Sequence, residues 1–367
     1  MIDIGYADAD YAARLDRASQ AMARHGIDAL AVSVGRDMPY LLGYEAMPSE
    51  RLTMAVVTHD AAPVVVVPQL EAPRVDTRDG LFEVVAWAET DDPVALVADR
   101  LGGGTVAVGS ETRAGFVLGL QGLADATFVD AAAVMRELRM VKDSEELAML
   151  RAAGAAVDRV VARLHTTRFA GREERDVARE IDEMTVAEGH QVASFAIVAA
   201  GPNAASPHHE PGERTIAHGD TIVIDFGGRW HGYGSDTTRT FSVGEPSEAV
   251  AAAHAVLHEA QQLGVSSVRP GVTAAHIDRV TRDVIDAAGY GEYFIHRTGH
   301  GIGLDGHEHP YLVEGDDTVL EPGMTFSIEP GIYVAGEWGM RIEDIVAVTD
   351  DGVENFNQSD RSLAIVD

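Results

Sequence analysis

Two aspartates lie in strand-like runs of one glycine-rich stretch, VIDFGGRWHGYGSDTTRTF. In TIVIDFG the apolar side chains at positions 222, 224 and 226 share one face, which leaves Asp225 on the other face. A hairpin centred between Trp230 and His231 would place Asp236 directly opposite Asp225, with Cβ atoms about 4.5–5.5 Å apart. Because two carboxylates at that distance repel each other, this register predicts a cation between them.

A second pair of acids has the same arrangement further along the chain. Glu329 and Glu343 lie in apolar runs of MTFSIEPGIYVAGEWGMRIEDIVAV, and a hairpin centred on Gly336 would pair them. Each hairpin alone is explained more simply by surface acids on a half-exposed strand. Acids in apolar strands are costly to bury without a partner. The two hairpins together, with the histidines described next, favour a metal site.

Histidines gather in two further motifs. RTGHGIGLDGHEHP contains His300, flanked by glycines that allow close approach of the backbone, and His307; SPHHEPGER contains His208 and His209. A lone histidine is more often a surface or core residue than a ligand. The spacing in HEHP differs from the H-E-x-x-H motif of helical zinc sites, and GHGIG lacks the strand-to-helix context of a nucleotide-binding loop.

Two aspartates, two glutamates and one histidine form a hard ligand set dominated by oxygen. The sequence contains no cysteine, so thiolate ligands, disulfides and a cysteine nucleophile are excluded. Such a set suits two Mn²⁺, Co²⁺ or Zn²⁺ ions about 3.5–4 Å apart. Two ions of this kind activate water and polarise a carbonyl group. The predicted chemistry is therefore hydrolysis of an amide or ester.

Several elements must position these residues, and the length of the chain predicts two domains. The first third alternates a helix ending at Gly26 with strands in IDALAVSV, LTMAVVT and APVVVVP, which is an α/β pattern. GGGT at 102–105 precedes a strand, so we interpret it as a turn and not as a phosphate-binding loop. We place the limits of the domains at 1–138 and 139–367.

The second domain is predicted to be α+β, with helices on a largely antiparallel sheet. A connector leads into a long helix, which we expect Ser144 to cap, with Glu145 and Glu146 in its first turn. Three more helices are expected over the runs REERDVAREIDEMTVAEG, SEAVAAAHAVLHEAQQLG and TAAHIDRVTRDVIDAAG. The remaining segments are strand-like and bounded by glycines.

The charge balance is strongly acidic, with 59 acidic and 28 basic residues and a net charge of −31. Lys142 is the only lysine. Such a chain is poorly suited to binding nucleic acid or anionic membranes. We expect a halophilic source, although the codon bias of a GC-rich genome would also favour arginine over lysine. No run of about 18 apolar residues and no signal-peptide pattern are present, so we expect a cytoplasmic protein.

The motifs IDFG, SDTTRTF, TGHGIGLDGHE, SIEPGIY and RIEDIV, in this order, resemble the M24 metallopeptidases. The resemblance implies a pita-bread catalytic domain. MPYLLGY and the connector ELRMVKDSEELAMLRAAG resemble the smaller α/β N-terminal domain and linker of the branch that contains creatinase, prolidase and aminopeptidase P. This branch implies a homodimer that hydrolyses Xaa-Pro bonds in peptides, as a dipeptidase or an aminopeptidase.

The resemblance also implies roles for individual residues. The metal ligands would be Asp225, Asp236, His300, Glu329 and Glu343. Asp225 would bind one ion, His300 and Glu329 would bind the other, and Asp236 and Glu343 would bridge the two. Glu329 would also be the general base.

The resemblance implies three further groups around the metals. His208 and His307 match two histidines that bind the substrate carbonyl and stabilise the tetrahedral intermediate. His208 is preferred over His209 because it directly follows the proline of the family's PH pattern. Arg341 resembles an arginine that orients ligating carboxylates.

The sequence departs from the prolidase pattern at Tyr311. Prolidases carry an arginine shortly after the HE segment, which anchors the C-terminal carboxylate of the dipeptide, whereas HEHPYLVEGDDTVLEPG contains none. Three alternatives therefore stay open: an Xaa-Pro peptidase, a hydrolase of a non-peptide amide or amidine such as ectoine, and a metal-free binding protein.

Overall fold

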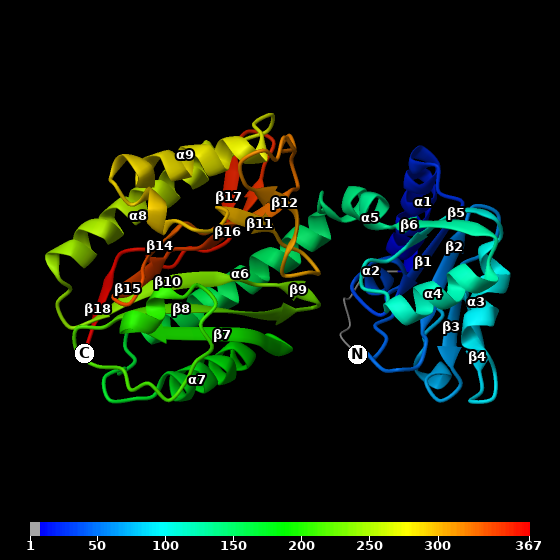
Figure 1. The fold of residues 1–367 in the computed structure, drawn as a ribbon, viewed down its shortest axis with the longest axis horizontal. Coiled ribbons are helices and arrows are strands. Elements are labelled where there is room, and N and C mark those ends of the chain that lie inside the picture. Colours follow the sequence, from blue (N-terminus) through cyan, green and yellow to red (C-terminus); the bar gives the residue numbers. More distant parts are fainter. Residues whose placement is uncertain (1–7) are drawn as a thin grey trace. The chain divides into compact units, whose positions relative to one another are not determined.

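The computed structural model describes residues 8–367 (Figure 1). The chain forms two compact units, Met1–Arg139 and Met140–Asp367. All the candidate site residues named above belong to the second unit. Within the described residues, none of the helices combines the length and the apolar character needed to cross a membrane.

The N-terminal unit contains a six-stranded sheet in the order β4-β3-β2-β1-β5-β6. Its strands are β1 (Ala29–Ser33), β2 (Met54–Thr58), β3 (Val64–Pro68), β4 (Glu83–Trp87), β5 (Gly104–Val108) and β6 (Ala126–Asp130). The β1–β2 and β2–β3 pairs are antiparallel, and the other pairs are parallel. The three strands expected from the sequence are confirmed as β1, β2 and β3.

Helices alternate with most of these strands, as predicted, whereas β2 and β3 are joined by a short turn. The helices are α1 (Asp8–His25), α2 (Asp37–Leu42), η1 (Ala72–Arg74), α3 (Pro93–Leu101), α4 (Ala114–Leu123) and α5 (Ala132–Arg139). Gly26 has φ +66° and ends α1. Gly102 and Gly104 have positive φ, +68° and +91°, and Gly104 and Thr105 are the first residues of β5. GGGT therefore leads from α3 into a strand and does not open a helix, so the prediction that it is not a phosphate-binding loop is confirmed, although only Gly102 and Gly103 lie in the turn.

Two larger sheets and one hairpin form the β-structure of the C-terminal unit. The first sheet has the order β18-β10-β8-β7 with β9 beside β8, and the second has the order β12-β11-β13-β16-β17. The strands are β7 (Val192–Ala200), β8 (Thr221–Trp230), β9 (Tyr233–Gly234), β10 (Thr237–Val243), β11 (Gly299–Gly301), β12 (Glu308–Leu312), β13 (Thr325–Ile328), β14 (Gly331–Val334), β15 (Trp338–Arg341), β16 (Asp344–Val348), β17 (Val353–Asn355) and β18 (Ala364–Val366). Only β10–β18 is a parallel pair, so the predicted antiparallel character is confirmed.

Two pairs of long helices cover these sheets (Figure 1). The helical elements are α6 (Ser144–Leu164), α7 (Glu174–Ala187), η2 (Gly201–Ala205), α8 (Glu248–Ser267), α9 (Ala274–Ala287) and η3 (Gly291–Tyr293). Apolar side chains of α6 and α7 form one core with β7, β8 and β10. Those of α8 and α9 pack on the second sheet and on the β14–β15 hairpin.

The expected cap of the long helix α6 is wrong by one residue. Asp143, and not Ser144, accepts hydrogen bonds from the backbone N–H groups of Glu145 and Glu146 at 3.0 and 2.9 Å. In return, the Glu146 side chain accepts a hydrogen bond from the N–H of Asp143, which completes a capping box. Aspartate is as good an N-cap residue as serine, and its negative charge also interacts favourably with the N-terminus of the helix.

The predicted register of the first hairpin is also wrong. Thr238, and not Asp236, lies opposite Asp225, because the turn consists of His231 and Gly232. Both turn residues have positive φ, +47° and +84°. A centre displaced by one residue shifts the partner by two, and a shift of two keeps every side chain on its own face.

The register of the second hairpin is confirmed. Gly331 pairs with Arg341 on one side of the two acids and Ile328 pairs with Asp344 on the other, as a centre at Gly336 requires. Between these pairs the chain changes sheet. The N–H of Glu329 donates to the carbonyl oxygen of Thr298, just before β11, and that of Glu343 donates to the carbonyl oxygen of Thr238 on β10.

Candidate metal centre

The backbone of Thr238 links the strands that carry the acids. It pairs with Asp225 on β8 and forms an isolated antiparallel bridge with Glu343, and thus joins the two sheets. Asp236 lies two residues before Thr238. Glu329 comes from the end of β13, which pairs with the strand that follows Glu343.

The five predicted ligands lie in two overlapping groups within the described residues. Ligand atoms of Asp225, Asp236 and Glu343 all lie within 4.8 Å of one another, and so do those of His300, Glu329 and Glu343. Glu343 belongs to both groups. Asp236, His300 and His307 form a third set of the same size.

Several oxygens in this cluster are buried without a partner. Among the described residues, Asp225 Oδ1, Asp236 Oδ1 and Glu343 Oε1 are inaccessible and accept no hydrogen bond. These three residues are at most 7% exposed. Buried anionic oxygens that point at one another are costly, so the donor set fits bound divalent cations.

Burial and mutual repulsion change the protonation of the cluster. Burial, together with the charges of Glu343 and Asp225, raises the pKa of Asp236 well above its usual value. Burial and the charges of Glu329 and Asp225 do the same to the pKa of Glu343. Burial raises the pKa of Glu329 to about 7, although Arg341 acts in the opposite direction. Divalent cations would relieve the repulsion, because they favour the charged carboxylates.

The ring of His300 is oriented for a ligand role. Its Nδ1 lies 3.1 Å from the carbonyl oxygen of Gly301, so Nδ1 carries the hydrogen and Nε2 faces the cluster. Nε2 is 3.3 Å from Glu329 Oε1 and 3.8 Å from Asp236 Oδ2. Burial lowers the pKa of His300 to about 3, which keeps the imidazole neutral.

Arg341 is buried beside the cluster and touches several of its members. Its Nη2 donates to Asp225 Oδ2 at 2.6 Å, and its Nε donates to the hydroxyl of Thr238 at 3.0 Å. The same threonine hydroxyl donates to Glu343 Oε2 at 2.7 Å. Nη1 donates to the hydroxyl of Tyr333 at 2.8 Å. One guanidinium group thus orients two of the carboxylates.

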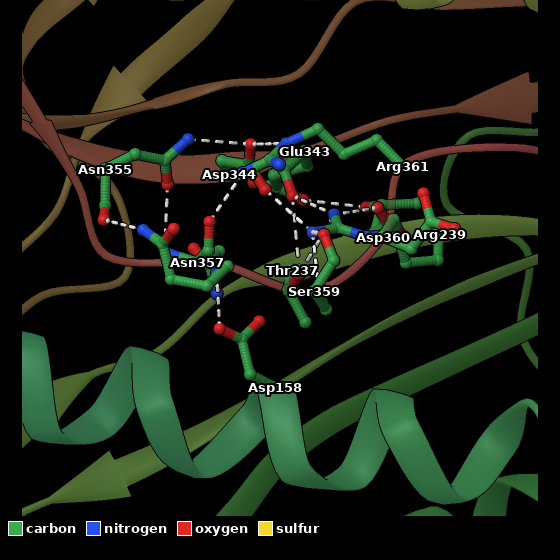
Figure 2. Close-up of polar contacts among 12 residues, drawn as sticks. Asp158, Thr237, Arg239, Glu343, Asp344, Asn355, Asn357, Ser359, Asp360 and Arg361 are labelled. Atoms are coloured by element: carbon green, nitrogen blue, oxygen red, sulfur yellow. Dashed lines mark hydrogen bonds and ion pairs between the residues drawn. The ribbon is translucent and has the colours of Figure 1, made fainter.

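A second buried arginine holds the backbone on which Glu343 is carried. Arg239 donates from Nη1 to the carbonyl oxygen of Glu343 at 2.7 Å and from Nη2 to Asp344 Oδ1 at 2.8 Å. Arg361 contacts the other oxygen of Asp344 at 2.5 Å, and Figure 2 shows both guanidinium groups directed at this carboxylate. Asn355 donates to the same oxygen at 2.9 Å. The chain on both sides of Glu343 is therefore fixed.

A cavity of about 780 Å³ opens on the cluster. Its lining includes all five predicted ligands together with His208, His307 and Arg341. His208 is exposed and forms no hydrogen bond in the described part of the chain. The rings of His300 and His307 lie 3.7 Å apart between centroids. Eight of the nine residues singled out from the sequence therefore meet at one cavity.

Tyr311 is the residue that does not line this cavity. It lies on β12 opposite His300. Its ring contacts the ring of His309 in a tilted arrangement, and the guanidinium group of Arg297 lies over it, 4.2 Å from the ring centroid. Arg297 itself lines the cavity and donates to Nδ1 of His307 at 3.1 Å. Among the described residues it forms no ion pair. Arg297 was not predicted from the sequence, because no spacing rule links an arginine in a loop to a tyrosine 14 residues later.

Comparisons with known proteins agree with this geometry. A model described as metallopeptidase family M24 matches residues 148–350, which is more than half of the chain. The chain belongs to metallopeptidase family M24. A model of the creatinase/prolidase N-terminal domain matches residues 14–141 of this M24 chain. These matches confirm the expected family and the expected fold, a smaller α/β domain followed along the chain by a pita-bread domain.

Individual relatives resemble the M24 chain over almost its whole length. The probable dipeptidase PepE of Mycobacterium tuberculosis is 47% identical and covers 97% of this chain and 96% of its own. The Xaa-Pro dipeptidase of Lactobacillus helveticus is 37% identical, with 96% and 98% covered. The crystal structure of dipeptidase PepE from Mycobacterium ulcerans has a TM-score of 0.94 at 45% identity and covers 98% of this chain and 99% of that one.

Proposed function

We propose that this M24 chain is a peptidase that depends on two divalent metal ions and hydrolyses Xaa-Pro dipeptides. The observation that carries the proposal is the convergence of five predicted ligands, with unpartnered buried oxygens, at the floor of one cavity. The names of the similar relatives, dipeptidase PepE and Xaa-Pro dipeptidase, support the substrate class.

Asp225 would hold one ion, His300 and Glu329 the other, and Asp236 with Glu343 would serve both. The two groups of ligand atoms share Glu343, which supports this division. Bound metal ions would supply an activated water and polarise the scissile carbonyl. The oxygen-rich donor set favours manganese among the candidates Mn²⁺, Co²⁺ and Zn²⁺.

The chain's own residues would carry the proton and hold the substrate. Glu329 is the proposed general base, because its carboxylate lies at the cavity and within 3.3 Å of His300 Nε2. It would take a proton and deliver it to the leaving prolyl nitrogen. His208 and His307, which line the same cavity, would donate to the carbonyl oxygen as negative charge develops on it.

An apolar wall of the cavity suits the proline ring. Phe195 and Ile197 of β7 and the exposed Ile295 line the cavity beside the polar cluster. A prolyl ring presents only carbon atoms on its outer face and therefore gains from such a wall. The wall offers no hydrogen-bond acceptor to the nitrogen of the residue after the scissile bond. Proline needs none there, because it has no backbone N–H to donate.

Arg297 would replace the missing prolidase arginine and bind the C-terminal carboxylate of a dipeptide. The sequence offers Tyr311 where prolidases have that arginine. The structure places the Arg297 guanidinium over the Tyr311 ring, at the cavity and without a carboxylate partner among the described residues. In a chain of net charge −31 an unpaired arginine is well suited to an anionic ligand.

The test is metal-supplemented hydrolysis of Xaa-Pro dipeptides, Xaa-Pro tripeptides and ectoine by the purified full chain. We expect cleavage of the dipeptides with added Mn²⁺, loss of activity on chelation and recovery on re-addition. Cleavage of tripeptides at a similar rate would contradict the dipeptide assignment. Cleavage of ectoine alone would contradict the peptidase assignment.

Three further properties accompany this proposal. A homodimer is supported by exposed apolar side chains in the N-terminal unit, among them Leu118 and Leu123 of α4, and by β6, which is an edge strand of the sheet. A halophilic source is supported by the net charge of −31. The cytoplasmic location predicted from the sequence stays a prediction, and cell fractionation would test it.

A further inference from the structure

A buried glutamate outside the candidate metal centre accepts its hydrogen bonds from one segment, residues 200–212, which runs from the last residue of β7 through η2 into the following loop and is called the 200–212 loop below. Glu174, the first residue of α7, is 0% exposed. Its Oε1 accepts from the N–H of Ala200 at 2.9 Å and from the side chain of Asn203 at 3.0 Å. Its Oε2 accepts from His209 Nε2 at 2.8 Å and from the N–H of Gly212 at 3.2 Å. All four donors lie within residues 200–212.

No arginine or lysine among the described residues forms an ion pair with Glu174. A carboxylate without such a partner is costly to bury unless its oxygens are satisfied by hydrogen bonds. The four donors of the loop meet this requirement, and His209 gives the shortest of the bonds. The fold of residues 200–212 and the burial of Glu174 therefore depend on each other.

The same loop carries His208 to the cavity. On one side of His208, the carbonyl oxygen of Pro207 accepts from the Arg341 guanidinium at 3.4 Å. On the other side, His209 is bound to Glu174. The His208 side chain itself lines the cavity and is without a hydrogen bond in residues 8–367. Both flanking residues are fixed, and the central side chain is available to a substrate.

We infer that Glu174 and His209 are positioning residues that hold His208 in its place at the cavity. The expected effect on activity rests on the proposed function, whereas the expected effect on the loop does not. The two adjacent histidines then have different tasks: His208 contacts the substrate, and His209 fixes the loop by binding a carboxylate on the opposite side. The effect of His209 on catalysis passes entirely through His208.

A double-mutant cycle tests this dependence. The variants are H209A, H208A and H208A/H209A, assayed for kcat and KM on an Xaa-Pro dipeptide with saturating Mn²⁺. We expect H209A to lower kcat about 10- to 100-fold, because small displacements of a catalytic group are costly, with a smaller change in KM. In the H208A background, the same change should alter kcat less than about twofold.

Conservative variants separate positioning from general loss of structure. H209Q retains an N–H donor and should recover much of the kcat lost in H209A. E174Q replaces an oxygen by a group that cannot accept and should behave like H209A. The matched control is E210Q, which changes the exposed neighbour Glu210 in the same loop and should leave kcat unchanged. Equal losses from H209A in the wild-type and H208A backgrounds would overturn the inference.

Hydrogen exchange of the metal-free protein decides the structural part without any activity. E174Q should speed exchange of the amides of Ala200 and Gly212, and the E210Q control should not. Unchanged protection in E174Q would overturn the inference. If the wild-type chain fails to cleave every Xaa-Pro peptide, the proposed function fails, and the exchange comparison still decides whether Glu174 holds the loop.

Discussion

Unpartnered oxygens mark the candidate metal centre at the scale of single residues. Asp225, Asp236 and Glu343 each have one buried oxygen that accepts nothing from the described residues, whereas their other oxygens are hydrogen-bonded or face a neighbour. In a close-packed interior such oxygens are rare, because an unsatisfied polar group is costly. The arrangement follows if the missing partners are cations, and it explains why four acids are tolerated in apolar strands.

Glu329 is the residue whose removal should affect turnover most. Replacing it by glutamine keeps the size of the side chain but removes both the negative charge and the ability to accept a proton. We expect kcat for an Xaa-Pro dipeptide to fall about 10²- to 10⁴-fold in E329Q, the range usual for a lost general base. Circular dichroism checks the fold and metal analysis checks occupancy. Turnover close to wild type in a folded, metal-loaded variant would refute the assigned role.

Arg297 should determine the preference for a free C-terminal carboxylate. In R297M the apolar stem that covers Tyr311 is retained and the charge is lost. Hydrogen bonds to charged groups contribute about 1.5–3 kcal/mol, so KM for the dipeptide should rise about 10- to 100-fold. The corresponding dipeptide amide, which lacks the charge, serves as the matched substrate and should be affected little. Equal losses on both substrates would argue against carboxylate binding.

The sequence predicted ligand types better than substrate contacts. Acids inside apolar runs and a histidine between glycines are local signals, and the structure brings all five residues to one cavity. Arg297 has no such local signal. Its position at the cavity arises because β11 and β12 pair His300 with Tyr311, which brings a loop arginine over a ring on the next strand. That proximity is a property of the tertiary structure.

At the scale of elements, turn chemistry decided which register was predictable. Residue 336 has a left-handed turn conformation, φ +78°, which glycine alone adopts at no steric cost. Gly336 therefore indicated the centre of the second hairpin. In the first hairpin the turn is His231-Gly232, and a histidine at φ +47° is uncommon. The displaced centre still gave the correct face for Asp225, because the error was two residues.

The segment that follows Glu343 should contribute strongly to stability. Asp344 is 0% exposed and binds both Arg239 and Arg361 (Figure 2). Burial alone would raise its pKa, but the two arginines lower the pKa below the usual value. In D344N both guanidinium groups lose their counter-charge, so we expect the free energy of unfolding to fall by about 3–5 kcal/mol.

Urea denaturation of the metal-free protein measures this change. The control is E354Q, which breaks the exposed ion pair between Glu354 and Arg151 and should alter stability by less than about 1 kcal/mol. If D344N and E354Q lost similar amounts, the buried network would not have the role that its contacts indicate.

His254 on α8 should make stability depend on pH. Burial lowers its pKa to about 4, from an ordinary value of 6.5. Between these values the unfolded chain binds a proton that the folded chain does not, so this contribution to stability is lost as the pH falls from 6.5 towards 4. Between pH 7 and 5, wild type should lose about 2 kcal/mol more than H254Q. Parallel stability curves for the two proteins, measured without metal, would contradict this assignment.

At the scale of the whole molecule, the length of the chain predicted the number of units, and the sequence pattern predicted their classes. Length indicated two domains, and the structure divides into two compact units. The change from short alternating strands and helices to long helices with acidic strands marked the change of class. The alternation could not reveal that the catalytic unit contains two separate larger sheets, because strand pairing between distant segments leaves no local periodicity.

The net charge of −31 predicts that salt stabilises the folded chain. Repulsion among carboxylates is greatest in the compact state, and the screening length falls from about 10 Å at 0.1 M salt to about 3 Å at 1 M. Surface ion pairs weaken over the same range, but acidic residues outnumber basic ones by 59 to 28, so most carboxylates have no basic partner to lose. The urea midpoint should therefore rise with KCl.

Urea is the denaturant of choice because it adds no ions. The metal-saturated protein should show a rising midpoint from 0.1 to 3 M KCl, as the halophilic hypothesis requires. A triple variant E183Q/E259Q/E321Q removes three exposed carboxylates that form no ion pair among the described residues. Because it carries less repulsion, it should be more stable than wild type at low salt and gain less from KCl. A flat midpoint in wild type would instead favour codon bias as the origin of the arginine-rich, lysine-poor composition.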